Sequence, residues 1–138
     1  ILLERHTLEA VMSMPDNLFP GVGTITSICV FTSNIPHPSN KETWFGYWKD
    51  DGYRIRKNKR MEREAGSWEK TKKLWLDMYF KRKEIKSYSI LKNISANEEW
   101  CAEAYLETDY STLKDIDFEN AAREYALHCL KYNIPSNK

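Results

Sequence analysis

The sequence predicts an α/β fold in which extended segments come first and helices follow. Two runs rich in β-branched and apolar residues, residues 7–15 and 24–33, suit strands that a sheet buries. From residue 67 onward, apolar side chains instead recur at helical spacing. With 138 residues, 41% of them hydrophobic, the chain can bury one ordinary core. We therefore expect a single domain over residues 1–138.

The first two strands are expected over residues 7–14 and 24–33. The first ends at a Pro-Asp-Asn turn, and the second is apolar almost throughout, as in a strand covered on both faces. Between them, Gly21 and Gly23 give the loop a superficial likeness to a phosphate-binding loop. A dinucleotide fingerprint would need a third glycine at Thr26, and its loop would follow a strand and open a helix. We therefore interpret these glycines as turn residues.

A β-hairpin is predicted next. Residues 42–48 and 53–57 flank an Asp51-Gly52 pair, which can supply the positive φ angles of a tight turn. A further short extended piece is expected over residues 87–91.

Three helices are predicted in the second half. Ser67 can cap a helix over residues 67–82 that has a cationic exterior. Its aromatic and apolar side chains share one face: Trp68, Trp75, Met78 and Tyr79. A capping box at residues 95–98 opens a helix over 98–110, and the last helix covers 117–132. The last helix is expected to bury one stripe: Phe118, Ala122, Tyr125, Cys129 and Tyr132.

Charge is distributed unevenly although the net charge is only +1. Residues 49–92 carry a net charge of +8, whereas residues 1–48 carry −2 and residues 93–138 carry −5. The densest part, residues 54–63, holds six cations and one acid. Such a block attracts polyanions through counterion release. The alternative is an ordinary solvated hairpin face.

Composition excludes several classes of protein. No apolar run approaches the roughly 20 residues of a membrane helix, and the N-terminus lacks a secretory signal pattern. We therefore expect a cytoplasmic protein without a membrane partner. The three histidines lack metal-ligand spacing, so no metal site is expected. The odd number of cysteines argues against a disulfide framework. They are expected to be small buried side chains: Cys29, Cys101 and Cys129.

Four collinear segments carry a resemblance to a known family. They read LLERHTLEAVMSMPDNLFP, GVGTITSICVFTSNIPH, KETWFGYWKDDGYRIRKNKR and EWCAEAYLETDYS, and together they span residues 2–111. This pattern resembles the adenine-N6 DNA methyltransferase subunit of type I restriction-modification systems. The resemblance implies the C-terminal part of a Rossmann-like methyltransferase sheet, in which residues 7–14 and 24–33 are the last two strands. The second of these would run antiparallel to the rest, and C-terminal helices would follow the hairpin.

The resemblance divides the chain into the last strands (1–48), a basic hairpin and helix (49–94) and C-terminal helices (95–138).

The resemblance also implies what this chain lacks. The family binds S-adenosylmethionine through a glycine-containing motif and acts at an Asn-Pro-Pro-Tyr/Phe motif, and neither occurs in the sequence. The opening ILLERH reads as the last turn of a helix whose beginning is missing. We therefore expect a fragment without catalytic residues, inactive alone, whose intact parent uses S-adenosylmethionine.

Two kinds of DNA contact follow from the resemblance. Enzymes that modify a base flip it out of the duplex and stack it on aromatic rings. The resemblance places Phe31 in that role, with Phe19 as a weaker candidate, and the alternative is that Phe31 belongs to the core. The cations expected to grip DNA phosphates are Arg54, Arg56, Lys57, Lys59 and Arg60.

The implied partners are double-stranded DNA and the specificity and restriction subunits of the same system. The C-terminal helices would pack on the sheet or contact the specificity subunit. Loss of neighbouring strands would leave a raw sheet edge, through which self-association is plausible. The alternative function is a stand-alone nucleic-acid-binding or subunit-docking module without catalysis.

Overall fold

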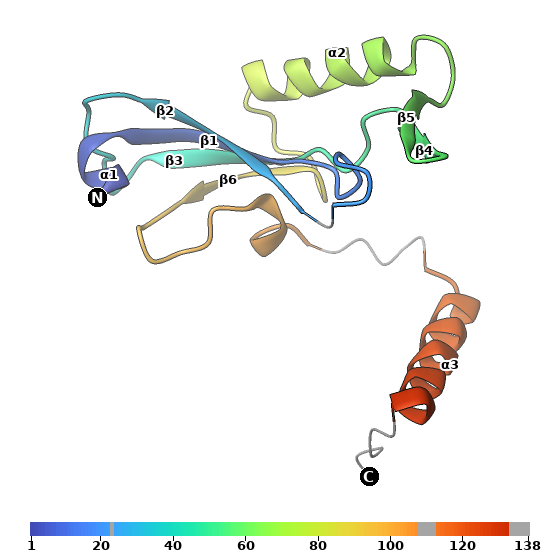
Figure 1. Ribbon diagram of the computed structural model, residues 1–138. Helices are drawn as coiled ribbons and strands as arrows, with labels where there is room; N and C mark the ends of the chain where they lie inside the picture. Colours follow the sequence, from blue (N-terminus) through green and yellow to red (C-terminus); the bar gives the residue numbers. More distant parts are fainter. Residues whose placement is uncertain (23, 108–112, 133–138) are drawn as a thin grey trace. The chain divides into compact units, whose positions relative to one another are not determined.

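The chain divides into two compact units, residues 1–107 and 108–138, and each is described by itself. The computed structural model describes all residues except 23, 108–112 and 133–138. The first unit holds a four-stranded sheet, a two-stranded hairpin and helix α2, and the second holds helix α3 (Figure 1). The predicted α/β class is confirmed.

The main sheet has the strand order β2-β1-β3-β6. Its strands are β1 (Thr7–Ser13), β2 (Ser27–Thr32), β3 (Glu42–Tyr47) and β6 (Ser89–Asn93). β1 runs antiparallel to β2 and parallel to β3, and β6 runs antiparallel to β3. Val11 lies opposite Cys29, and Met12 lies opposite Ile28. The predicted antiparallel pairing of the first two strands is therefore confirmed.

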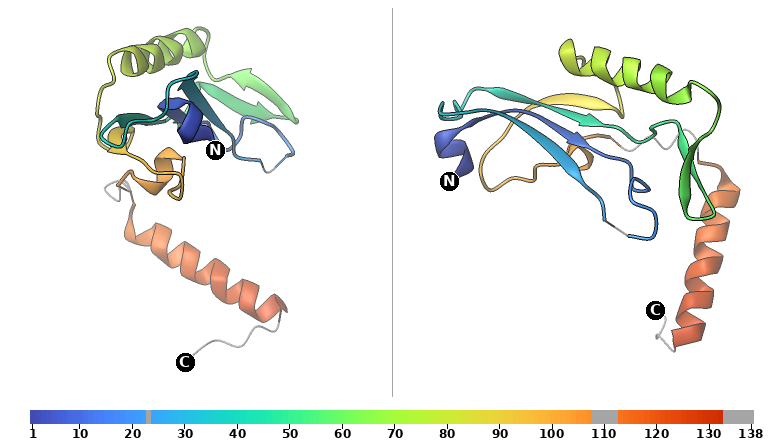
Figure 2. Two further views of the ribbon diagram at one scale, coloured as in Figure 1. Left: turned by 90° about the vertical axis from the view of Figure 1, so that its left-hand side faces the viewer. Right: turned by 45° about the horizontal axis from the view of Figure 1, so that its top comes forward.

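Both faces of this sheet are covered. Helix α2 (Ser67–Phe80) lies over one face (Figure 2), and the 3-10 turn η1 (Ala102–Ala104) packs on the other. Successive residues of β3 point to opposite faces, so Trp44 meets α2 and Phe45 meets η1. The core under α2 comprises Ala10, Met12, Trp44, Trp48, Trp75 and Met78. The core on the opposite face comprises Leu8, Val11, Phe45, Ile94 and Ala102.

β2 is more exposed than the sequence predicts. Within the described residues it pairs only with β1, and Ile28, Cys29 and Thr32 are exposed. The expectation of a strand covered on both faces is therefore wrong. An apolar run indicates that a strand can be buried, but burial also requires other elements that pack over it. Of the three cysteines, Cys129 is buried, Cys101 is half-buried and Cys29 is exposed.

The predicted hairpin has a different partner. Residues 42–48 belong to the main sheet, and they do not pair with 53–57. The observed hairpin consists of β4 (Tyr53–Arg56) and β5 (Lys59–Glu62). Lys57 and Asn58 form its turn with φ angles of 50° and 60°, which two-residue hairpins favour. Gly52, with a φ of 80°, instead turns the connection between β3 and the hairpin.

Helix α2 confirms the predicted helix and corrects its cap. The N-cap position is Gly66, and the Ser67 hydroxyl donates to the Gly52 carbonyl at 2.8 Å. The Glu62 carboxylate accepts the N–H groups of Gly66 and Trp68 at 3.3 and 3.1 Å. A carboxylate from the hairpin therefore satisfies the first N–H groups of the helix.

The helix predicted over 98–110 is reduced to η1 within the described residues, and residues 108–110 lie outside them. The capping box is half formed: the Ser95 N–H donates to Glu98 Oε2 at 2.5 Å, but the Glu98 N–H bonds the Ser95 carbonyl. The Ser13 hydroxyl of β1 accepts the Ala102 N–H at 2.9 Å. This contact holds the segment against the sheet as a single turn.

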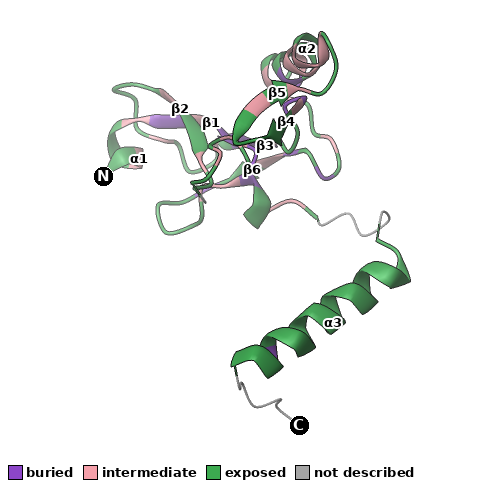
Figure 3. Ribbon diagram, turned by 45° about the vertical axis from the view of Figure 1, so that its right-hand side comes forward, coloured by how far each residue is buried: buried purple, intermediate pink, exposed green. Residues whose placement is uncertain are grey.

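Helix α3 (Asp115–Tyr132) confirms the last predicted helix. Within its own unit, its expected stripe is largely exposed: Phe118, Tyr125 and Tyr132 are 59%, 66% and 58% exposed, and Cys129 is buried (Figure 3). The unit alone therefore does not bury the stripe. In the described part of the chain, no helix is long and apolar enough to cross a membrane.

Gly46 of β3 provides a test of the core. A Cβ at this position would lie 2.3 Å from the ring of Trp44, which is fully buried and cannot move aside. We expect Gly46→Ala to lower the free energy of unfolding by about 1–3 kcal/mol, as overpacking does, in urea denaturation. Gly21→Ala is the comparison, because no atom lies within 4 Å of its added Cβ and only its φ of +77° opposes the change. An unchanged free energy of unfolding in Gly46→Ala would contradict this packing.

Candidate nucleic-acid interface

The carboxyl ends of β1 and β3 define one end of the sheet. Because the two strands are parallel, the segments that follow them emerge side by side. The Trp48 N–H after β3 donates to the carbonyl of Ser13, the last residue of β1, at 2.9 Å. In α/β sheets, ligands bind beyond the carboxyl ends of strands. The residues at this end are therefore the first candidates for a functional site.

After β1, the described residues 14–22 and 24–26 belong to a loop that presents Phe19. The loop is closed at its base by the Met14 N–H, which donates to the Thr26 carbonyl at 2.9 Å. A turn near its tip is formed by the Val22 N–H and the Phe19 carbonyl at 3.2 Å. Phe19 is 47% exposed. The loop therefore offers an aromatic ring to solvent at the carboxyl end of β1.

After β3, the chain enters the hairpin, and Arg60 fixes the hairpin to that loop. Its guanidinium forms an ion pair with Asp51, and the two side chains are 17% and 8% exposed. The other guanidinium nitrogen donates to the Asn17 carbonyl of the loop at 2.9 Å. Asp51 also accepts the Tyr53 N–H at 3.0 Å, and Arg60 lies over the Tyr53 ring at 5.2 Å. Arg60 therefore joins the hairpin and its base to a loop that is distant in sequence.

A second ion pair lies nearer the surface. Arg63 pairs with Asp50, and these side chains are 47% and 59% exposed. The hydrogen bond from Arg63, followed by that from the Gly52 N–H, lowers the pKa of the Asp50 carboxyl below its usual range. Two of the hairpin cations are thus neutralised by carboxylates at its base.

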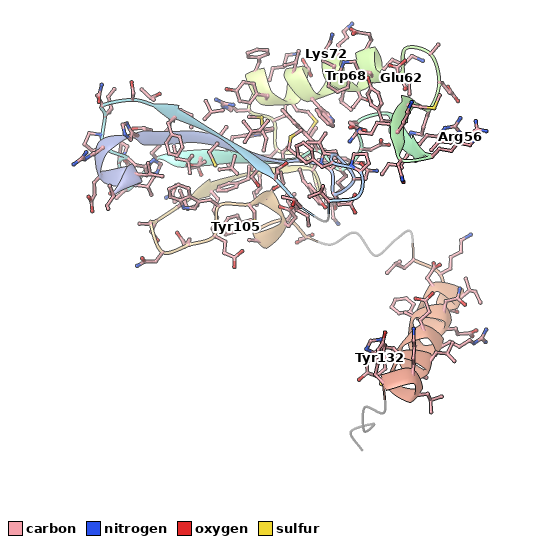
Figure 4. The ribbon with its side chains drawn as sticks, viewed as in Figure 1. Arg56, Glu62, Trp68, Lys72, Tyr105 and Tyr132 are labelled. Atoms are coloured by element: carbon pink, nitrogen blue, oxygen red, sulfur yellow. The ribbon has the colours of Figure 1, made fainter. Side chains whose placement is uncertain are left out.

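The remaining predicted phosphate contacts face solvent: Arg54, Arg56, Lys57 and Lys59. None of the four forms an ion pair with another described residue. Arg56 extends from the hairpin into solvent (Figure 4). Arg60, the fifth predicted contact, is half-buried in its structural bonds. The structure therefore brings four free cations together and gives the fifth a positioning role.

Phe31 lies at the opposite end of the sheet. It pairs with Leu8 near the start of β1, five residues and roughly 17 Å along the strand from Ser13. Its half-buried ring packs against Trp100 and His6, with ring centres 6.1 and 6.4 Å away. The structure thus brings Phe19, and not Phe31, to the end that carries the hairpin.

Sequence reasoning missed Asp51 and the Asn17 carbonyl as the anchors of Arg60. An acidic pair just before a cation-rich stretch was the available signal for Asp51. The Asn17 contact uses a backbone oxygen, so no residue type could indicate it.

Comparison with known proteins decides the family. Residues 1–128 match the family described as N-6 DNA Methylase. The chain belongs to this family.

Individual relatives of this N-6 DNA methylase chain are longer proteins. It is 40% identical over 57 residues to the type II restriction enzyme and methyltransferase RM.BcgI of Heyndrickxia coagulans, which covers 41% of this chain and 9% of the relative. A crystal structure of the type I restriction-modification methyltransferase subunit from Streptococcus thermophilus is similar at 22% identity and a TM-score of 0.45, over 65% of this chain and 17% of that one. The chain thus spans less than a fifth of either relative.

One cavity of this N-6 DNA methylase chain does not fit S-adenosylmethionine, the methyl donor that the family resemblance implies. This cavity of about 700 Å³ lies at the amino end of β1, next to helix α1 (Leu2–Arg5). Its walls include Glu4 and Glu98 but no phenyl, phenol or indole ring that could stack on an adenine. It is also remote from the carboxyl ends of β1 and β3, where such folds bind cofactors. We derive no cofactor chemistry from these residues.

No group of described residues has the composition of a metal site.

The two ion pairs of the hairpin differ in burial and allow a matched test. Asp51→Asn would leave the Arg60 guanidinium half-buried without its counter-charge, and we expect it to lower the free energy of unfolding by about 3 kcal/mol. Asp50→Asn removes an exposed partner of Arg63 and is expected to cost about 0–1 kcal/mol. Urea denaturation near neutral pH measures both values. If Asp50→Asn proved the more damaging change, Arg60 would not be the anchor of the hairpin.

Proposed function

We propose that this chain is the C-terminal, DNA-contacting part of an adenine-N6 DNA methyltransferase from a type I restriction-modification system. Family membership over residues 1–128 supports the methylase function. The collinear resemblance of four segments supports the type I assignment. The intact protein would use S-adenosylmethionine, and its catalytic residues would lie in polypeptide outside this chain.

One observation carries the DNA-contacting role: Arg60 ties the loop that presents Phe19 to a hairpin with four free cations. Cations on a rigid hairpin can contact successive phosphates, which positions DNA without reading its sequence. An exposed aromatic next to them can stack on a base that has left the duplex. The two contacts are those that a base-modifying enzyme requires at the edge of its active site.

The proposed partners are double-stranded DNA and the specificity and restriction subunits of the system. Sequence reading would belong to the specificity subunit, consistent with a hairpin that offers only phosphate contacts. We place the complex in the cytoplasm. The unpaired edge of β2 would allow self-association when this chain is isolated.

For base stacking we propose Phe19. Phe31, which the resemblance placed in this role, packs on Trp100 and His6 at the other end of the sheet. Phe19 is 47% exposed and lies two residues from the carbonyl that Arg60 holds. A ring that stacks on a flipped base must be accessible, as Phe19 is, and the bond between Arg60 and Asn17 keeps the loop of Phe19 beside the hairpin that carries the proposed phosphate contacts.

Charge reversal tests the phosphate contacts. Arg54→Glu/Arg56→Glu removes two proposed contacts, and each contributes about 0.9 to the slope of log affinity against log salt. We expect the slope to fall by about 2 when binding of short double-stranded DNA is measured by fluorescence anisotropy between about 50 and 200 mM salt.

The control makes the same charge change at the amino end of the sheet. Arg5→Glu/Lys92→Glu replaces two exposed cations there and is expected to leave the slope near that of the unaltered protein. Both variants should be measured on this chain and on the longest polypeptide that its gene encodes. Equal slopes in the two variants would refute the proposed phosphate contacts of the hairpin.

Two phenylalanine variants separate stacking from packing. Phe19→Ala should weaken binding to DNA with an extrahelical target adenine by about 1–3 kcal/mol, the value of one base stacked on an aromatic ring. Phe31→Ala should leave that affinity unchanged and lower the melting temperature, because its ring packs on Trp100. Binding by the longest encoded polypeptide and its thermal unfolding are the two measurements. The reverse pattern would return the stacking role to Phe31.

A further inference from the structure

Lys49 lies between two tyrosine rings just after β3. Its Nζ is 5.1 Å from the ring centre of Tyr47 and 5.3 Å from that of Tyr88. The Tyr47 N–H donates to the Tyr88 carbonyl at 2.7 Å, which holds the two tyrosines together. Lys49 is exposed and Tyr88 is 48% exposed. We call Tyr47, Lys49 and Tyr88 the lysine cradle.

The cradle is at the same end of the sheet as the hairpin. Tyr47 is the last residue of β3, and Tyr88 immediately precedes the antiparallel strand β6. Trp48, which lies between Tyr47 and Lys49 in the chain, is buried and stacks on Trp75 with ring centres 4.4 Å apart. The next residue, Lys49, is exposed. Lys49 is also two residues before Asp51, the anchor of Arg60. The cradle thus adjoins the base of the hairpin.

The chemistry of the cradle suits an anion. Lys49 forms no ion pair with a described residue, so its charge remains free for a ligand. The two rings attract the ammonium and restrict its side chain, which reduces the conformational entropy that a bound anion would remove. Each of the two tyrosines also carries a phenol O–H, which donates hydrogen bonds.

The described acidic groups near the cradle change the pKa of Tyr47 but form no ion pair with Lys49. Burial, then Glu103 and Asp16, raise the pKa of the Tyr47 phenol, so this group keeps its proton at neutral pH. Glu103 is itself hydrogen-bonded to the Ser13 hydroxyl. Asp50, next in the chain, pairs with Arg63. Lys49 forms no ion pair with these described acids, and of the three only Asp50 is paired with a cation.

We propose that the lysine cradle binds a phosphate of the DNA backbone, adjacent to the phosphates held by the hairpin. This inference rests on the proposed function, because it takes DNA as the ligand. The cradle adds a contact on the sheet itself to those on the hairpin. Two contact points on different elements would fix the direction in which the backbone crosses this end of the sheet.

The chain contains a matched control at the opposite end of the sheet. Lys92 is also exposed, and its Nζ lies 5.5 Å from the ring centre of Tyr105, but it pairs with Thr43 near the start of β3. Lys49→Glu and Lys92→Glu therefore make the same change to the same type of contact at the two ends.

The experiment measures the salt dependence of double-stranded DNA binding by the longest encoded polypeptide. We expect Lys49→Glu to lower the slope of log affinity against log salt by about 1, uniformly across DNA sequences. Lys92→Glu should leave the slope unchanged. Lys49→Arg keeps the positive charge, so its slope should equal that of the unaltered protein. Lys49→Met, a neutral variant of similar length, should lower the slope as well, and it guards against misfolding from the introduced acid.

The outcomes separate this inference from the proposed function. If Arg54→Glu/Arg56→Glu lowers the slope but Lys49→Glu and Lys49→Met do not, DNA binds the hairpin and the cradle inference is overturned. If none of the variants changes the slope, both proposals fail. Equal losses from Lys49→Glu and Lys92→Glu would show a general charge effect and would also overturn the inference.

Discussion

Residues Ala10 to Ser13 of β1 lie in register beside Trp44 to Tyr47 of β3, and both strands run in the same direction. This parallel pairing determines where the other parts of the first unit lie. Parallel neighbours need a crossover connection, and here the crossover contains β2, which returns antiparallel along the outside of β1. As a result, the loop before β2 and the chain after β3 emerge at the same end. Phe31, near the end of β2, is carried to the other end.

The basic block has two physical roles that its net charge does not distinguish. Asp50 and Asp51 neutralise Arg63 and Arg60, and Glu62 satisfies the start of α2. These acids fix the hairpin by its inner side and leave the cations of its outer side free. A buried ion pair stabilises little relative to apolar packing, but it strongly penalises any arrangement that separates its partners. The acids at the base of the hairpin thus specify the geometry in which its free cations act.

Sequence patterns predicted the elements well where a local rule decides the structure. The β-branched runs and the family resemblance located β1 and β2 as an antiparallel pair, and the spacing of Trp75 and Met78 located the buried face of α2. The hairpin was assigned to the wrong strands because Asp51-Gly52 indicates a turn without indicating which strands pair. Lys57 and Asn58 adopt positive φ angles, which asparagine favours but lysine does not signal.

The candidate site was less predictable because it depends on tertiary contacts. The four free cations were identified from composition, but the role of Arg60 follows from its bond to the Asn17 carbonyl, which no residue type encodes. The proposal of Phe19 in place of Phe31 rests on strand direction, which counting residues from a motif does not give. The helix expected after Ser95 is reduced to a single turn that a tertiary contact, the hydrogen bond between Ser13 and Ala102, holds against the sheet.

The stacked indoles of Trp48 and Trp75, with ring planes 9° apart, join β3 to α2 beside the base of the hairpin. Two indoles this close share their excited states, so the near-ultraviolet circular dichroism band of the pair differs from that of separate rings. The amplitude of this band depends on both rings keeping their mutual orientation. The protein therefore contains an intrinsic optical reporter of whether the helix is seated on the sheet, readable without any attached label.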